Sequence, residues 1–312
     1  MSAPAPPANA AAFLTLESFL AEAPAFRLGE LPTEQPHPRT RGLAELAVSH
    51  PARAAALLAE VDRDALAVLR SASDAVDELG RDIDDTLRAG GRVFLCGCGA
   101  TGRLALSLET LWREQAGGGA PGSGHPDQVV SLMAGGDAAL IRSLEGFEDH
   151  PQYGARHLAD LGFGRDDLFV GCTEGGETSY VIGATEHAAA VTRRAPWFLY
   201  CNPDDALRGI ERSRRVIENP AIRSLSIAVG AMALSGSTRM QAATVLMLAV
   251  GIPLLGDRAP GAARRALDRL GRHLDAANAA GRSGDLGALI EAETAIYRAG
   301  DAITYEAEAH AI

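Results

Sequence analysis

The residues best suited to hold a ligand stand in a glycine-rich loop, Gly97–Arg103, which reads GCGATGR. Glycines let a backbone approach a ligand closely, and a helix that starts in such a loop offers N–H groups to an anion. The candidate contacts are Gly99, Ala100, Thr101 and Gly102. A dinucleotide fingerprint has similar glycines, but no acidic residue ends the next expected strand, Val129–Met133, where the ribose partner belongs. A tight turn without a ligand is a further interpretation.

A second loop with the chemistry of an anion site is Ser235–Arg239, which reads SGSTR and precedes a helix expected to begin at Met240. The hydroxyls of Ser235, Ser237 and Thr238, together with backbone N–H groups at a helix start, form a phosphate cradle that needs no lysine. An ordinary capped helix terminus explains the same residues. Two such loops at one edge of a sheet favour a phosphorylated small molecule as the ligand.

The chain has two acidic segments, of which the first could hold sugar hydroxyls or move protons. The first, Gly171–Thr178, supplies the candidate contacts Thr173, Glu174, Gly175 and Glu177. The second, Glu145–Asp149, contains Glu148. Solvated surface carboxylates are the alternative for the first segment, and the second, taken alone, is typical of a solvated helix end. Histidines do not recur at metal-ligand spacing, and Cys96-Gly97-Cys98 is an insufficient ligand set, so we expect no metal and no other cofactor.

The elements that must position these loops alternate between strand and helix. Five short runs are apolar on nearly every residue and suit strands covered on both faces: Arg92–Cys96, Val129–Met133, Asp167–Cys172, Trp197–Cys201 and Leu225–Val229. Helical patterns follow most of them: Arg103–Arg113, Ala138–Leu144, Tyr180–Arg193 and Arg239–Val250. The alternation predicts an α/β fold with a doubly wound parallel sheet, whose ligands bind beyond the carboxyl ends of the strands.

The flanks of this region divide the chain into four predicted segments. Residues 1–30 read as a disordered or extended tail, 31–90 as a helical segment, 91–255 as the sheet domain and 256–312 as a C-terminal helical segment. Gly42–Arg88 is helical throughout, with Pro51 opening a helix. The last segment has helices over Gly261–Ala279 and Asp285–Ala299, separated by a flexible break at Gly281–Gly284. Ala302–Tyr305 resembles the start of a strand, as if a further domain followed.

Composition excludes several classes of function. All 29 basic residues are arginine, which rules out a Schiff-base lysine and a lysine-dependent phosphate loop. With 40 Asp and Glu the net charge is −11, so we expect no nucleic-acid or anionic-membrane partner. Apolar runs fall short of the ~20 residues of a membrane helix. Four cysteines are too few for a disulfide scaffold, and we expect a cytoplasmic protein.

With these loops identified, the chain resembles a sugar isomerase (SIS) domain protein, in the group of the N-acetylmuramic acid 6-phosphate etherases and the glucokinase regulatory protein. The resemblance covers roughly residues 31–255 and is carried by six motifs in order: Thr33-Glu34-Gln35, Gly97–Arg103, Met133–Gly136, Glu145–Asp149, Cys201-Asn202-Pro203 and Ser235–Met240. It implies a flavodoxin-like five-stranded parallel sheet, a hexose-phosphate ligand held by the two loops above, and pairing of SIS domains.

The resemblance also identifies Glu148 with one of the two glutamates by which the etherases act as acid and base. The other lies eight residues beyond the arginine of the glycine-rich loop, where this chain has Leu111. Glu109 points about 200° away around a helix. Glu114 has nearly the same direction, but lies about 4–5 Å further along the axis.

Two more departures from the family pattern make the expected pocket less cationic. The loop Thr173–Glu177 lacks the family's serine and adds negative charge, and Gln241 replaces a lysine. Phosphate binding would then rest on amides, hydroxyls and Arg103 or Arg239.

The departures favour a sensor or regulator that binds a hexose or amino-sugar 6-phosphate as a homodimer or paired with a second SIS domain. The alternative is an N-acetylmuramic acid 6-phosphate etherase, a carbon–oxygen lyase with Glu148 as base and Glu114, Glu174 or Glu177 as acid. Aldose–ketose isomerisation is a third possibility, for which the sequence shows no decisive acid/base pair.

Overall fold

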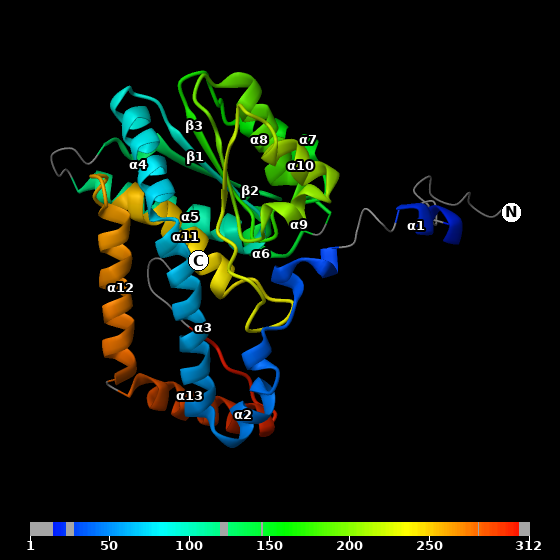
Figure 1. The fold of residues 1–312 in the computed structure, drawn as a ribbon, viewed down its shortest axis with the longest axis vertical. Helices are drawn as coiled ribbons and strands as arrows, with labels where there is room; N and C mark the ends of the chain where they lie inside the picture. Colours follow the sequence, from blue (N-terminus) through cyan, green and yellow to red (C-terminus); the bar gives the residue numbers. More distant parts are fainter. Residues whose placement is uncertain (1–14, 23–27, 119–123, 145, 280, 306–312) are drawn as a thin grey trace, which may run out of the picture.

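The computed structural model describes residues 15–22, 28–118, 124–144, 146–279 and 281–305. Its centre is a single parallel sheet of order β2-β1-β3-β4-β5 (Figure 1). The strands are β1 Val93–Gly97, β2 Val129–Met133, β3 Leu168–Cys172, β4 Trp197–Tyr200 and β5 Arg223–Ser226. The expected α/β fold with a five-stranded, doubly wound parallel sheet is therefore confirmed.

Helices cover both faces of the sheet. The helices before β3 are α1 Leu16–Glu22, α2 Leu43–Ser49, α3 Pro51–Ser71, α4 Ser73–Arg88, α5 Gly99–Gly117, α6 Ala138–Ile141 and α7 Pro151–Asp160. Those after β3 are α8 Ser179–Val191, α9 Asp204–Arg208, α10 Glu211–Ile217, α11 Gln241–Leu255, α12 Ala262–Ala279 and α13 Arg282–Arg298. No described helix is both long and apolar enough to cross a membrane.

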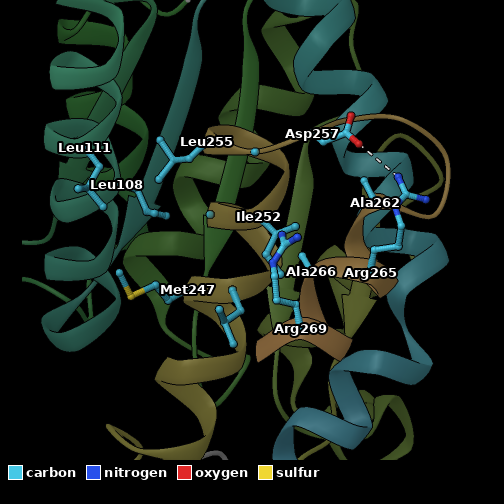
Figure 2. A pocket seen from close by; sticks show the side chains of 13 residues that line it. Leu108, Leu111, Met247, Ile252, Leu255, Asp257, Ala262, Arg265, Ala266 and Arg269 are labelled. Carbon is cyan, nitrogen blue, oxygen red and sulfur yellow. Dashed lines mark hydrogen bonds and ion pairs between the residues drawn. The ribbon is translucent and has the colours of Figure 1, made fainter. Parts of the chain in front are cut away.

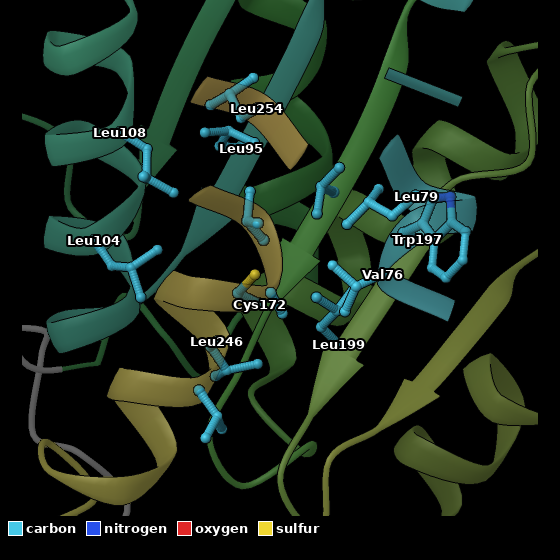
Figure 3. Close-up of a cluster of buried hydrophobic side chains, with 14 of the residues drawn as sticks. Val76, Leu79, Leu95, Leu104, Leu108, Cys172, Trp197, Leu199, Leu246 and Leu254 are labelled. Carbon is cyan, nitrogen blue, oxygen red and sulfur yellow. The ribbon is translucent and has the colours of Figure 1, made fainter. Parts of the chain in front are cut away.

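The alternation of side chains along β1 separates two cores. Val93 and Leu95 point into a cluster shared with α3, α4, α5, α11 and α12, part of which Figure 3 shows. Phe94 and Cys96 point into the other cluster, against α7 and α8. Each strand is therefore covered on both faces, which explains its uninterrupted apolar sequence.

The segments before and after the sheet pack on the same core. Leu69 of α3 and Leu79 of α4 are fully buried in the cluster that also holds Leu254 of α11 (Figure 3 labels Leu79 and Leu254). Pro51 stands at the first turn of α3, as expected. The domain boundaries at residues 30, 90 and 255 stay predictions. Within residues 1–30 the structure places α1 and the short 3-10 helix Leu28–Glu30.

Several sequence-based expectations were wrong in detail. The last strand is Arg223–Ser226 rather than Leu225–Val229, because the apolar run continues into a loop beyond the ladder. The break expected over Gly281–Gly284 is narrower: Gly281 adopts a left-handed conformation, and α13 begins at Arg282 rather than at Asp285. Residues 302–305 are irregular rather than a strand.

Candidate functional site

The loop after β1 brings the first turn of α5 directly onto the end of the strand. A Cβ added at Gly97 would lie 2.3 Å from the backbone carbon of Thr101, so only glycine permits this approach. Gly99, with φ +51, turns the chain into the helix. The N-terminus of α5, with the amides of Gly99 and Ala100 in its first turn, thereby faces the edge where strands β1 and β3 end. Such a terminus attracts anions.

Thr101 shapes this loop from within. Its hydroxyl donates to the carbonyl of Cys98 at 2.8 Å and accepts from the Cys98 N–H at 3.0 Å. The residue is 1% exposed, so its oxygen is engaged in capping the helix. Gly102 has a packing role, because an added Cβ would lie 2.2 Å from Met133. The glycine-rich motif and Met133–Gly136 are thus in direct contact.

A cavity of about 230 Å³ opens in front of α5. Its wall includes Cys98, Gly99, Arg103, Glu148 and Arg239. Arg103 comes from the second turn of α5, and Arg239 comes from the segment before α11. Two guanidinium groups and a helix N-terminus therefore meet at one small cavity, which is the composition of an anion site built without lysine.

Glu148 reaches the same cavity from the loop between α6 and α7. One of its carboxylate oxygens accepts a hydrogen bond from the Cys98 thiol at 2.9 Å, and its backbone carbonyl accepts from the N–H of Tyr180 at 2.9 Å. The side chain is otherwise exposed. Burial and the hydrogen bond to Glu148 raise the pKa of the Cys98 thiol well above its ordinary value. Cys98 is consequently a protonated hydrogen-bond donor at neutral pH and a poor nucleophile.

Glu174 stands in the loop after β3. Its Oε1 is sealed from solvent and has no hydrogen-bond partner. Burial raises the pKa of this carboxyl to about 7; the nearby Arg239 opposes the shift and Glu148 adds to it. Glu174 is thus a largely buried carboxyl that exchanges its proton near neutral pH.

The rest of the loop after β3 has other partners. Glu177 forms an ion pair with Arg212 at 2.7 Å and turns towards α10. Thr173 is buried, and its hydroxyl is 2.9 Å from that of Thr178 while it accepts from the N–H of Gly176. The carbonyl of Gly175 accepts from Asn202 at 2.8 Å. Of the two glutamates in this loop, Glu174 is largely buried and has no partner for its Oε1, whereas Glu177 is held on Arg212.

The Ser235–Arg239 segment forms a tight turn before α11. The N–H of Ser237 donates to the carbonyl of Leu234 at 2.9 Å, and Gly236 has φ +77. Ser235 is exposed, and Thr238 precedes the arginine that lines the cavity. The helix begins at Gln241, one residue later than expected, without a side-chain cap from this turn.

Gln241, which stands where the family pattern has a lysine, forms its hydrogen bonds within the protein. Its Oε1 accepts from the N–H of Ala233 at 2.7 Å, and its Nε2 donates to the carbonyl of Ala231 at 2.9 Å. The residue is 2% exposed. It therefore braces the turn from inside instead of presenting a polar group to a ligand.

Two further motifs from the sequence meet behind the site. Asn202 donates to the hydroxyl of Thr33 at 2.8 Å and accepts from the N–H of Thr33 at 3.1 Å. Both side chains are fully buried. Asn202, which follows β4, therefore links Thr33 of the N-terminal segment to Gly175 in the loop after β3. Sequence reasoning gave Asn202 and Cys98 no function; their only signal was their place inside short motifs.

The structure does not bring Glu114 to Glu148. Glu114 is fifteen residues after Gly99 on α5, about 22 Å along the axis. Leu111 instead lines an apolar cavity of about 480 Å³ between α5, α11 and α12, together with Leu108 and Met247 (Figure 2). The carboxylate of Glu109 accepts a hydrogen bond from the N–H of Ser131 at 2.7 Å.

Among the described residues, no three His, Cys, Asp or Glu side chains are grouped as a metal site requires.

Comparison with known proteins agrees with this arrangement of motifs. Residues 73–189 match the family model of the glucokinase regulatory protein N-terminal SIS domain. The chain is 33% identical over 218 residues to the N-acetylmuramic acid 6-phosphate etherase of Synechococcus elongatus, which covers 70% of this chain and 64% of that protein. The etherase of Mycolicibacterium smegmatis is 31% identical over 220 residues, with coverage of 70% and 66%.

A third relative, the etherase of Rhodopirellula baltica, is 29% identical over 234 residues, 74% of this chain and 70% of that protein. The chain therefore spans about two thirds of the length of the curated relatives it matches. Among solved structures, phosphoheptose isomerase GmhA from Neisseria gonorrhoeae aligns over 82% of this chain at 14% identity and a TM-score of 0.33. On the family model and the etherase relatives, the chain belongs to the sugar isomerase (SIS) domain proteins, in the group of the N-acetylmuramic acid 6-phosphate etherases and the glucokinase regulatory protein.

Proposed function

We propose that this protein binds a hexose or amino-sugar 6-phosphate in the cavity before α5 and acts as a sensor or regulator. The observation that carries the proposal is the meeting of Arg103, Arg239 and the N-terminus of α5 at one small cavity that also contains Glu148. The guanidinium groups and the amides of the first turn would hold the phosphate, since both donate several directed hydrogen bonds to its oxygens. Glu148 would accept hydrogen bonds from the sugar.

The hydroxyls that the sequence analysis assigned to the phosphate differ in how they could act on it. Thr101 supports the phosphate indirectly, because its hydroxyl holds the shape of the loop. Ser237 and Thr238 belong to the turn that carries Arg239, and we propose that they contact the phosphate after the turn adjusts to the ligand.

A regulatory function is favoured by the position of the missing glutamate. Leu111 lines an apolar cavity together with Leu108 and Met247, so no carboxylate acts from that position (Figure 2). Glu114 lies too far along α5 to share a substrate with Glu148, because an acid catalyst must stay within hydrogen-bond reach of the proton that it transfers. Glu177 is held by Arg212.

One observation favours the alternative, an etherase that removes lactate from N-acetylmuramic acid 6-phosphate. Burial gives Glu174 a pKa of about 7, to which the charge of Glu148 contributes, and such a group can give and take a proton near neutral pH. The relatives named above are etherases, and Glu174 is the glutamate that this chain could use in place of the lost one.

A two-part experiment separates these functions. Lactate release is assayed with N-acetylmuramic acid 6-phosphate, and binding of several hexose 6-phosphates is measured by calorimetry. For a regulator we expect binding without lactate release. Lactate release that disappears in Glu148→Ala would replace the regulator with the etherase. If the protein binds no sugar phosphate at all, the proposed site itself is wrong.

The remaining parts of the proposal concern partners and location. The acidic net charge of −11 supports the expectation that neither nucleic acid nor an anionic membrane surface is a partner. We propose that the protein is cytoplasmic, where sugar phosphates are produced and consumed, and that it pairs with a second SIS domain, in a homodimer or otherwise.

A further inference from the structure

The cavity of about 480 Å³ between α5, α11 and α12 has a separate set of walls (Figure 2). Among the described residues, it shares none of its lining with the cavity before α5. Its aliphatic walls include Leu108 and Leu111 of α5, and Met247, Ile252 and Leu255 of α11. Leu108 is 1% exposed, so the hollow reaches the side chains of the buried core. The volume is within the range of small-molecule sites, roughly 300–1,000 Å³.

The side of this cavity formed by α12 is cationic. Arg265 and Arg269 line it one helical turn apart, and Asp257 lines it from the loop between α11 and α12. Arg265 pairs with Asp257 at 3.2 Å, as the dashed line in Figure 2 shows. Arg269 forms no hydrogen bond or ion pair with another described residue. Two arginines and one aspartate give this lining a net charge of +1, in a chain whose net charge is −11.

We propose that this cavity binds an aliphatic carboxylate, with its hydrocarbon chain among the side chains of α5 and α11 and its carboxylate on Arg269. Removal of the hydrocarbon chain from water drives the binding of the apolar part. A carboxylate accepts two parallel hydrogen bonds from a guanidinium, which gives Arg269 a partner and orients the ligand. Because none of the described lining residues is aromatic, the walls offer no stacking surface and favour an alkyl chain over a planar ring.

Calorimetry with the unmodified protein and three eight-carbon probes tests the inference. Octanoate, octan-1-ol and octylammonium have the same hydrocarbon chain and differ in the charge of the head group. We expect octanoate to bind with a Kd of about 1 mM or tighter, and at least about threefold tighter than octan-1-ol, because an accessible ion pair adds modestly to the burial of the chain. Octylammonium should bind most weakly, since it has the same charge as the arginines. Equal binding of the three probes, or no saturable binding of octanoate, would overturn the proposal.

Two pairs of variants on α12 locate the site. Arg269→Gln should remove the preference for octanoate over octan-1-ol. Arg272→Gln is its matched control and should keep the preference, because Arg272 lines a different cavity, between α3 and α12. Ala266→Leu should fill the space and weaken octanoate binding by about tenfold or more, because such sites enclose most of the ligand. Ala276→Leu, at an exposed position of the same helix, should leave binding unchanged. Loss of the preference in both arginine variants would contradict a carboxylate held by Arg269.

A second copy of this chain seated on the cavity is the rival occupant. It would exclude octanoate from the unmodified protein, and Ala266→Leu would then lower the mass measured by light scattering; this result would overturn the proposal. The proposed function has its own measurement, because glucose 6-phosphate is titrated against the other cavity. Binding of glucose 6-phosphate without binding of octanoate would refute the carboxylate site and leave the proposed function standing.

Discussion

At the scale of single residues, we expect Glu174 to affect stability because burial raises its pKa from 4.5 to about 7. A carboxyl whose pKa is raised by folding leaves stability unchanged below the unfolded pKa, where both states are protonated. Stability then falls as the pH rises from about 4.5 through 7, because the folded state resists ionisation. The full difference corresponds to about 3 kcal/mol at pH 8.

We therefore expect Glu174→Gln to raise the unfolding free energy at pH 8 by up to about 3 kcal/mol and to change it little at pH 4.5. Urea unfolding of both proteins at the two pH values measures this. Glu177→Gln serves as the control, since it removes the ion pair with Arg212 and should give no stabilisation at pH 8. An equal gain from Glu174→Gln at both pH values would contradict the burial of Glu174 as a charged group.

At the scale of elements, the contact between β1 and α5 depends on Gly97. An added Cβ would lie 2.3 to 2.5 Å from backbone atoms of Thr101 and Gly102, which cannot move aside without shifting the start of α5. We expect Gly97→Ala to lower the free energy of unfolding by about 1–3 kcal/mol. It should also weaken phosphate binding, because it displaces the amides of the first turn of α5. Gly117→Ala, at the other end of α5 with open space around it, should alter stability by less than about 1 kcal/mol. Thermal unfolding and phosphate titration of both variants decide this, and a Gly97→Ala protein that binds phosphate normally would refute it.

The strands and helices show how much of the fold could be predicted from the sequence alone. Uninterrupted apolar runs located four strands to within a residue or so, because burial on both faces leaves a clear pattern. Helix α7 was missed, since Gly154 lowers the helical propensity of a short segment. That glycine is needed because an added Cβ would lie 1.9 Å from the carbonyl of Tyr180 on α8, a contact that no local pattern reveals.

Some residues of the candidate site could likewise be predicted from the sequence, and others could not. Glu148 and the glycine-rich loop could be found from motifs, whereas the difference between Glu174 and Glu177 could not. It depends on Arg212, 35 residues further along the chain, which holds Glu177, whereas Glu174 is buried and has no partner for its Oε1. Likewise, the burial of Gln241 depends on hydrogen bonds to Ala231 and Ala233 in the folded loop.

At the scale of the whole molecule, charge opposes the pairing that we propose. Each chain carries a net charge of −11, so two copies repel one another at low ionic strength. Salt screens this repulsion over about 10 Å at 0.1 M and about 3 Å at 1 M, while apolar contacts between copies persist. We therefore expect the dimer to be favoured as salt increases. Light scattering during size-exclusion chromatography should give a mass near twice the 32.5 kDa of the chain, with a larger dimer fraction at 0.5 M than at 0.05 M NaCl. A single-chain mass at both salt concentrations and at about 100 µM protein would exclude the homodimer, and pairing would then require a different SIS domain.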